Sequence, residues 1–527
     1  MFSRHRVRPL ALAAGFGVLV SVVTPALAAD LTMGFSSEQQ SIDPLFSRTG
    51  PNQTAAAHIF DRLMERDEKG IFQPSLAESW KNVDPTTWEV KLRQNVKFHD
   101  GSPFTAEDVV FSIERAPKVP NSPASFESYV RSIKAMQVVD PYTLRFTSTT
   151  PDPTFMQNVG GVFIISKKVA ENATSADFNS GKVAIGTGPY KFVSWTPGDR
   201  MQLLRNDAYW GPKPEWEKVT IRYISNDPAR VAALLSGAVD VINEVPPTDI
   251  PTLKKDKRVN VINAASIRLI YIVLNQRDDA PGIAGLDGKP LPKNPYQDAR
   301  VRQAISLMID RAGIVDKVLF GQGVPTNNQV PEGILGYNPD LKPKYDVAAA
   351  KKLLADAGYP KGFSMTISGS NDRFLLDGDL VQGIGQLLAR GGLKVAKVEA
   401  LPYSVFSKAA GENGYGAWIF SNGNSAGEAG RGLESMLHTY DKDRKLGSLN
   451  RHSYSNQVFD KAIDAALDEF DDAKRWKLQA DAAAIAINDG GMIPLYHQAV
   501  TWATRKGFSY AGRRDEATLA MSTKTAK

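Results

Sequence analysis

The stretch LAESWKNVDPTTWEVKLRQNVKFHDGSPFTAEDVVFSIERA, residues 76–116, is decisive for the fold, although its second half looks like an active site. Residues 95–115 bring a histidine, several acids, serines and a threonine close together. Most of these residues can be assigned a role in forming the local structure instead of a role in catalysis. Asp100 and Gly101 form a turn pair, because glycine tolerates the positive φ that such turns require. Only His99 is left without a role in this local pattern.

A helix is predicted to begin directly after this turn. Thr105 stands at the N-cap position, and Asp108, three residues later, is placed to bond back to it as in a capping box. Phe104 and Val109 flank the cap as a hydrophobic staple. Acids in the first turn and Arg115 in the last turn suit the helix dipole. A hydrolase would need a base aimed at a nucleophile, and the spacing shows no such pair. The stretch is therefore predicted to be structural.

The stretch also resembles the signature region of the family 5 solute-binding proteins, which are periplasmic receptors of ABC importers for dipeptides, oligopeptides and related solutes. Four further blocks match this family in the right order. They are GTGPYKFVSWTPGDRMQLLRNDAYWG (186–211), ARVAALLSGAVDVI (229–242), DARVRQAISLMIDRAGIV (298–315) and YDVAAAKKLLADAGYPKGF (345–363). The resemblance covers nearly the whole chain after residue 28.

The resemblance implies an α/β fold of the type II periplasmic-binding class, with two lobes, a hinge and an extra subdomain in the first lobe. The implied division is residues 30–70, 185–275 and 498–527 for lobe I, 71–184 for its extra subdomain, and 276–497 for lobe II. The hinge is then expected at residues 275–279 and 495–499.

Local patterns agree with a mixed α/β chain. Alternation over 88–92 and the apolar run 271–274 predict strands. Val301, Ile305, Met308 and Ala312 recur at helical spacing. A further helix is predicted over 347–357, capped by Asp346. Residues 455–488 are predicted to form two helices with a break near Phe470. Proline- and glycine-rich stretches at 278–295 and 321–343 predict linkers or long surface loops.

Residues 1–28 have the features of a secretory signal peptide. Arginines precede an apolar run, and Ala26-Leu27-Ala28 provides a small-residue cleavage site. No later window approaches the length of a membrane span. The chain has no cysteine, which excludes disulfides, thiolate metal sites and a lipid-modified cysteine. We therefore expect a diffusible protein of the periplasm.

Charge gives no indication of a nucleic-acid partner. Without residues 1–28 the chain has 60 basic and 57 acidic residues, and the basic ones are scattered. The histidines show no metal-binding spacing, and the chain has neither a GxSxG nor an SxxK motif. We predict no catalytic residue, no metal and no cofactor.

The resemblance implies a ligand site between the lobes. The candidate ligand contacts are Ser36, Ser37, Glu38, Gly188, Asn275, Arg277, Tyr403, Trp418, Ser421, Asn422 and Glu428. Arg277 is the first candidate for a ligand carboxylate, because a guanidinium binds one through two hydrogen bonds; Arg373 is the second. Structural alternatives stay open: a surface position for Arg277, a core position for Trp418, and a glycine turn at Gly188.

One departure from the family pattern concerns the ligand's amine. In dipeptide-binding members, the loop that matches residues 418–428 carries an aspartate for this amine. This chain has none there, and Glu428 is the only acid nearby. Either Glu428 replaces the aspartate, or the ligand has no simple α-amine at that place.

The function expected from the resemblance is capture of a peptide-like solute in the inter-lobe cleft and its delivery to a membrane permease. The expected partners are the ligand, two permease subunits and two ATP-binding subunits, with the binding protein a monomer. The alternatives are another solute (an opine, a sugar, a glutathione-like peptide or a metal chelate) and, less favoured, a secreted hydrolase.

Overall fold

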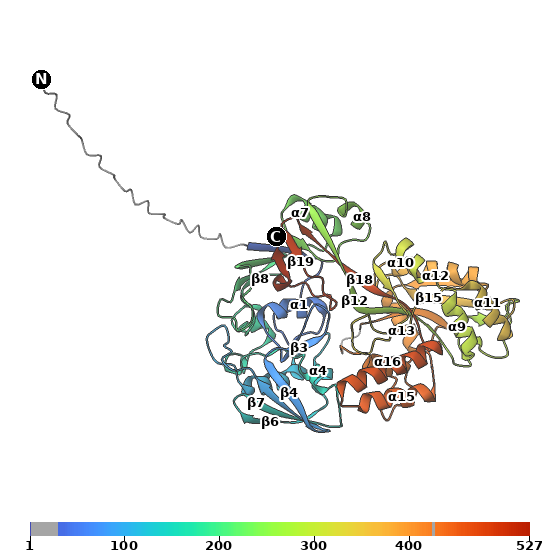
Figure 1. Cartoon of the computed structure of the whole chain (residues 1–527), viewed down its shortest axis with the longest axis horizontal. Coiled ribbons are helices and arrows are strands. Elements are labelled where there is room, and N and C mark those ends of the chain that lie inside the picture. The colour runs from blue at the N-terminus through green and yellow to red at the C-terminus, as the bar shows by residue number, and fades with distance from the viewer. Residues whose placement is uncertain (2–29, 424–426, 527) are drawn as a thin grey trace.

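The computed structural model describes Met1 and residues 30–423 and 427–526 of the 527-residue chain. The predicted signal peptide therefore falls almost entirely outside the described residues. The fold is mixed α/β and has two lobes (Figure 1). Lobe I contains the N-terminal part and the C-terminal end of the chain, whereas lobe II is built mostly from the second half. Within the described parts, no helix is both long and apolar enough to cross a membrane.

A single twelve-stranded sheet runs through both lobes. Its main path follows the order β13-β15-β17-β12-β18-β11-β1-β10-β9-β8, with β16 beside β15 and β14 beside β18. The strands are β1 (Asp30–Phe35), β8 (Tyr190–Thr196), β9 (Arg200–Arg205), β10 (Lys218–Tyr223), β11 (Val241–Ile242), β12 (Val259–Leu274), β13 (Ile283–Ala284), β14 (Gly323–Pro325), β15 (Ser364–Ser370), β16 (Lys394–Leu401), β17 (Ala417–Gly423) and β18 (Ile493–Arg505).

Two long antiparallel strands, β12 and β18, carry the sheet from one lobe to the other. Their pairing is interrupted between Ala265 and Leu269, where the register shifts. Ala264 packs in the lobe I core, whereas Ile270 belongs to the core of lobe II. The passage along β12 thus lies earlier in the chain than the 275–279 that we expected. A strand can change lobes without ending, so the end of the apolar run did not mark the crossing.

On β18 the passage between the cores lies between Tyr496 and Val500, within the expected 495–499. The exact lobe boundaries given in the sequence analysis stay a prediction.

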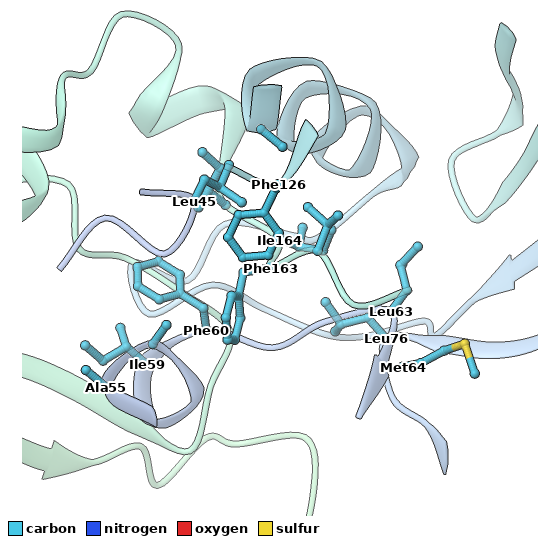
Figure 2. Packing of buried hydrophobic residues seen from close by; sticks show 14 of the residues in the cluster. Leu45, Ala55, Ile59, Phe60, Leu63, Met64, Leu76, Phe126, Phe163 and Ile164 are labelled. Atoms are coloured by element: carbon cyan, nitrogen blue, oxygen red, sulfur yellow. The ribbon is translucent and has the colours of Figure 1, made fainter. Parts of the chain in front are cut away.

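Lobe I contains a second sheet in the order β4-β5-β7-β6. Its strands and the helices that follow are β4 (Ala77–Asp84), β5 (Thr87–Leu92), α2 (Ala106–Arg115), η1 (Ala116–Lys118), α3 (Glu127–Val130), β6 (Ile133–Asp140), β7 (Thr143–Ser148), α4 (Phe155–Val159), α5 (Lys167–Ala170) and α6 (Ser175–Asn179). Side chains of this region share one core with α1 (Gly50–Ile59), where Phe60 and Phe163 lie together (Figure 2).

The other elements of lobe I are short. They are β2 (Met64–Arg66), β3 (Phe72–Pro74), α7 (Asp227–Ser236), α8 (Ile250–Leu253), β19 (Phe508–Tyr510), η3 (Ala520–Ser522) and β20 (Thr523–Thr525).

Lobe II has helices on both faces of its part of the sheet. Ile270 and Ile272 of β12 pack against one set of helices, and Leu269, Tyr271 and Val273 against the other, because successive strand residues face opposite sides. The first set is α9 (Ala299–Leu307), α10 (Arg311–Lys317), α11 (Val347–Asp356) and α12 (Asp377–Gly391), with η2 (Pro295–Gln297) before it. The second set is α13 (Tyr403–Gly411), α14 (Gly430–Leu437), α15 (Gln457–Asp468) and α16 (Asp472–Asn488).

Most local predictions are confirmed. Thr105 and Asp108 form the capping box of α2, and the Asp346 side chain accepts a bond from Ala349 N at the start of α11. Residues 455–488 form two helices. The continuous helical spacing from Val301 to Ala312 was misleading: α9 ends at Leu307, and the Asp310 side chain caps a new helix through Gly313 N at 2.8 Å.

Candidate ligand-binding cleft

One candidate site lies between the lobes, beside the passage of β12. A cavity of about 430 Å³ is lined mainly by lobe I, with Arg373 contributed by lobe II. A second cavity of about 380 Å³ adjoins it. We call them the larger and the smaller compartment. Glu244, Arg268, Arg373 and Glu516 line both compartments. Each is large enough for part of a small ligand.

Glu244 occupies the lobe I side, just after β11. Its φ of 46° is left-handed, an unfavourable conformation for a side chain with a Cβ. Arg230 of α7, only 1% exposed, stabilises this turn by donating to the main-chain oxygens of Asn243 (3.2 Å) and Glu244 (2.7 Å). Ser36 Oγ donates to the exposed Glu244 carboxylate at 2.6 Å. Within the described residues, Glu244 has no ion pair, so its charge faces the cleft.

Arg268 and Glu516 form an ion pair where the compartments meet. Arg268 Nη2 lies 3.2 Å from Glu516 Oε2, and both side chains are partly exposed. Arg268 lies within the irregular segment of β12 between Ala265 and Leu269, and Glu516 has a φ of 66°. Backbone strain of this kind often accompanies functional sites.

Arg373 faces the same space from the loop between β15 and α12. Its guanidinium lies 5.1 Å from the ring centroid of Tyr403, a cation–π distance. Its backbone N–H donates to Asp377 at 2.9 Å, which anchors the loop at the start of α12. Among the residues that the structure describes, no acid pairs with the Arg373 side chain, so it is available to a ligand carboxylate.

The lobe I wall of the larger compartment is rich in arginine. Arg62 pairs with Glu65 at 2.9 Å, and Arg513 pairs with Asp515 at 2.7 Å. Arg66 lies beside them on the same wall, over the ring of Phe72 at 4.3 Å. Burial lowers the pKa of Arg66, but a guanidinium stays charged in proteins. This wall is therefore a region of concentrated positive charge, partly offset by acids.

The residues expected after the first strand point in different directions. Ser37 lines the larger compartment, and Ser36 supports Glu244. Glu38 faces the β8–β9 turn instead, where it accepts bonds from Trp195 Nε1 (2.6 Å) and Gly198 N (2.9 Å).

Gly188 lies in a tightly packed turn. Its carbonyl oxygen accepts from Asn206 Nδ2 at 3.1 Å and contacts His99 Nε2 at 3.0 Å. A Cβ at this position would lie 2.5 Å from the carbonyl carbon of Ile59, so no side chain fits. His99 thus gains the structural role that the sequence pattern left open.

Asn275 and Arg277 lie away from the two compartments. Asn275 is fully buried and donates to Tyr415 O at 3.0 Å. Arg277 is exposed and pairs with Asp279 at 2.8 Å. Neither residue lines the cavities, which argues against direct ligand contact in this arrangement of the lobes.

The candidates on and after β17 are also placed inside lobe II. Trp418 is 2% exposed and packs in the core. Ser421 and Asn422 pair with Ile270 and Leu269 of β12. Residues 424–426 of the glycine-rich loop lie outside the described residues.

Glu428 has no exposed surface. Its carboxylate accepts bonds from three side chains of α16: Arg475 Nε and Trp476 Nε1, both at 3.2 Å, and Gln479 Nε2 at 3.0 Å. These bonds orient the Glu428 carboxylate toward α16. Contact of Glu428 and of the other candidate residues with a ligand stays a prediction.

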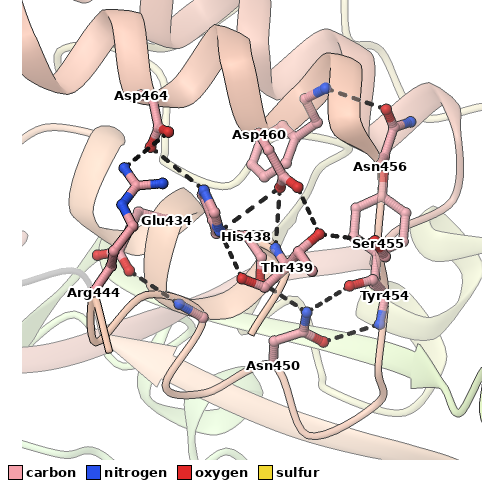
Figure 3. A network of polar contacts seen from close by, with 12 residues as sticks. Glu434, His438, Thr439, Arg444, Asn450, Tyr454, Ser455, Asn456, Asp460 and Asp464 are labelled. Atoms are coloured by element: carbon pink, nitrogen blue, oxygen red, sulfur yellow. Dashed lines mark hydrogen bonds and ion pairs between the residues drawn. The ribbon is translucent and has the colours of Figure 1, made fainter. Parts of the chain in front are cut away.

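A separate polar network surrounds His438 in lobe II (Figure 3). His438 Nε2 lies 3.4 Å from Asp464 of α15, and Arg444 pairs with the same carboxylate at 3.0 Å. Asn450 donates to the main-chain oxygens of His438 and Tyr454. These bonds tie the loop between α14 and α15 to α15. In the described parts of the chain, no group of three potential metal ligands is assembled.

Comparison with known families decides the class of the protein. A family model described as bacterial extracellular solute-binding proteins, family 5, matches residues 72–444. The chain belongs to this family. Family 5 proteins are solute-binding components of ABC importers, so this chain is a solute-binding protein of that kind.

Individual family 5 proteins match along most of their length. The chain is 27% identical to the probable D,D-dipeptide-binding periplasmic protein of Escherichia coli, covering 95% of this chain and 94% of that protein. It is 28% identical to heme-binding protein A of Haemophilus influenzae, covering 84% and 82%. Among solved structures, the unliganded open form of the periplasmic murein tripeptide-binding protein MppA matches with a TM-score of 0.81, 21% identity and coverage of 95% and 98%. The predicted two-lobed family 5 fold is confirmed.

Sequence patterns did not reveal three residues that line both compartments, Glu244, Arg268 and Glu516. One signal was available: Glu516 ends the charged run Arg513-Arg514-Asp515-Glu516. Nothing local marked Glu244 or Arg268, because their partners are about 200 residues or more away in sequence.

Proposed function

We propose that this family 5 protein binds a peptide-like solute in the inter-lobe cleft and delivers it to the permease of an ABC importer. It binds the solute without changing it chemically. It acts as a monomer in the periplasm and meets a transporter of two permease and two ATP-binding subunits.

The observation that carries the peptide assignment is the charge distribution in the cleft. An exposed carboxylate from lobe I (Glu244) and a guanidinium from lobe II (Arg373) line the same two compartments. A short peptide has an ammonium at one end and a carboxylate at the other. Such a ligand satisfies both side chains and joins the lobes, because guanidinium–carboxylate pairs are strong and directional.

Closure of the cleft follows from the same arrangement. The lobes are connected by β12 and β18, whose pairing is interrupted at the passage between the cores. A few residues of this kind commonly act as a hinge. A ligand that contacts both lobes favours the closed state, because it binds that state better than the open one. The similarity to an unliganded open form supports an open arrangement here.

Thermal unfolding of the mature protein with a panel of dipeptides, opines and sugars tests this function. The protein is first partly unfolded and refolded to remove any bound solute. A ligand at about 1,000 times its dissociation constant stabilises the folded state by roughly 4 kcal/mol. We expect dipeptides to raise the unfolding temperature and to be recovered unchanged by mass spectrometry.

Two arginine variants test the site, one inside the cleft and one outside the cavities as its control. Arg373→Ala removes a cleft guanidinium and is expected to weaken dipeptide binding about tenfold or more. Arg277→Ala removes an exposed guanidinium outside the cavities and is expected to leave binding unchanged. Stabilisation by an opine or a sugar alone would refute the peptide assignment. An equal loss in both variants would favour the sequence-based choice of Arg277.

A further inference from the structure

The lobes touch at a second place, away from β12 and β18. Arg431 of α14, in lobe II, places its Nη2 3.1 Å from Asp152 Oδ1, in the segment before α4 of lobe I. The Asp152 side chain is 8% exposed, and its Oδ1 also accepts bonds from the N–H and the hydroxyl of Thr154. The carboxylate is therefore fixed in lobe I, and Arg431 reaches it from the other lobe.

An aromatic contact joins the lobes in the same region. Phe470, in the turn between α15 and α16 of lobe II, packs against the core of lobe I. Its ring centroid lies 6.4 Å from that of Trp88 on β5, and Trp88 in turn stacks on Phe155 of α4. We call the two contacts between the lobes, Arg431–Asp152 and Phe470–Trp88, the clasp.

The clasp and Arg373 lie on opposite sides of the lobe II sheet. The helices α14, α15 and α16 cover the face that bears Leu269 and Tyr271, whereas α12, which follows Arg373, covers the face that bears Ile270. Figure 1 shows α10 and α12 above β12 and β18, and α15 and α16 below them, next to the second sheet of lobe I. The strands that connect the lobes thus run between the clasp and the Arg373 loop.

This position couples the clasp to closure of the cleft. Because β12 and β18 connect the lobes, a rotation about their passage that brings the Arg373 side of lobe II toward lobe I moves the opposite side of lobe II away from it. An ion pair and a ring contact both act over short distances, so they are lost when the groups separate. The clasp therefore belongs to the open arrangement of the lobes.

We infer that the clasp is an autoinhibitory contact, which holds the ligand-free lobes open and opposes closure. The inference rests on the closure described in the proposed function and adds a contact that tunes it. A contact made only in the open state lowers the population of the closed state, and so raises the apparent dissociation constant of a ligand that requires closure. Since no clasp residue lines either compartment, loss of the clasp should strengthen binding with the cavity lining unchanged.

Distances between two spin labels test the clasp directly, because the chain has no native cysteine. Gln137→Cys on β6 and Lys461→Cys on α15 place the labels at exposed positions, one in each lobe. In double electron–electron resonance of the ligand-free mature protein, we expect a single narrow distance distribution. Phe470→Ala should broaden this distribution and move it to longer distances, and Arg431→Ala should have the same effect to a smaller extent.

Calorimetric titration with the dipeptide Ala-Ala measures the effect on affinity. Phe470→Ala should bind Ala-Ala up to about tenfold more tightly than the wild type, and Arg431→Ala about threefold more tightly, as typical strengths of a ring contact and a partly exposed ion pair indicate. Arg444→Ala is the matched control, because it removes an ion pair with Asp464 inside lobe II. It should change neither the affinity nor the label distance. Saturating Ala-Ala should lengthen the label distance in the wild type.

The outcomes separate this inference from the function on which it rests. Label distances that stay unchanged in both clasp variants, or weaker binding of Ala-Ala by both folded variants, would overturn the inference while peptide binding stands. A label distance that shortens when Ala-Ala saturates the wild type would overturn it as well. If neither Ala-Ala nor any other dipeptide binds, the peptide function falls, and the label distances of the ligand-free variants alone decide whether the clasp holds the lobes.

Discussion

His99 shows how a residue that looks catalytic serves the fold. Its Nδ1 accepts a bond from Gly186 N at 3.3 Å, and its Nε2 lies 3.0 Å from Gly188 O. The two bonds require a neutral ring with its proton on Nε2. Burial lowers the pKa of His99 from 6.5 to about 4, with the bond to Gly188 acting in the opposite direction. The histidine therefore fastens the first signature stretch to the glycine turn of the second.

Stability should decrease with acidity partly because of His99. Its folded-state pKa lies below its unfolded value, so between about pH 6.5 and pH 4 the unfolded chain binds more protons and the free energy of unfolding falls as the pH falls. From the two pKa values, this group accounts for about 2 kcal/mol of the loss between pH 7 and pH 5. Urea unfolding of the wild type and His99→Gln at both pH values measures the difference.

His99→Gln should be less stable at pH 7 and should lose about 2 kcal/mol less than the wild type on acidification. A residual loss is expected, because burial also lowers the pKa of His58 and His452 to about 4 and that of His497 to about 3. An identical pH dependence in both proteins would show that His99 is not held neutral by the fold.

Single residues were predictable where their partners are close in sequence. The Thr105–Asp108 cap and the Asp100–Gly101 turn follow from local rules and are confirmed. The loop around Glu428 does not reveal the environment of this carboxylate, because α16 brings three donors to it from about 50 residues away. Such a side chain cannot be assigned to cleft or core without knowing the packing of the helix.

At the scale of elements, α2 owes its start to a buried cap. One Asp108 oxygen accepts from Thr105 N at 2.9 Å and the other from Lys167 N at 2.9 Å, so the residue fixes both α2 and α5. Thr105→Ala should cost about 1 kcal/mol of unfolding free energy, a typical value for a lost cap. Asp108→Ala should cost more, roughly 2–3 kcal/mol, because two main-chain donors lose their acceptor.

Chemical denaturation measures these losses, and α6 supplies the comparison. Thr174 and Asp177 form the same capping box at an exposed helix end. Asp177→Ala should therefore cost less than Asp108→Ala, since water replaces the lost acceptor. Equal costs at the two sites would contradict a buried structural role for Asp108.

The elements also show where pattern reasoning fails. Alternation and apolar runs located the strands, but β12 is 16 residues long and serves both cores. The point at which β12 passes from one core to the other depends on which helices cover each half of the strand. Those helices are distant in sequence, so local patterns do not reveal it. In the same way, the spacing across Val301 and Ala312 was helical on both sides of a break that the Asp310 cap creates.

At the scale of the whole molecule, the proposed function depends on bringing Glu244 of lobe I and Arg373 of lobe II to one ligand. The two-lobed fold was predictable because long sequence blocks match the family in order. The cleft residues were not, because β12, the C-terminal segment and two separate loops assemble them. The central claim is therefore about motion: a ligand held from both sides closes the lobes about β12 and β18.

Lobe closure can be measured by small-angle X-ray scattering of the refolded mature protein, alone and with a saturating concentration of the dipeptide that raises its unfolding temperature most. We expect the radius of gyration to decrease when the dipeptide binds. Arg373→Ala, at the same dipeptide concentration, should keep the larger radius of the free protein. Saturated binding with an unchanged scattering curve would rule out ligand-driven closure, because the ligand would then be held without drawing the lobes together.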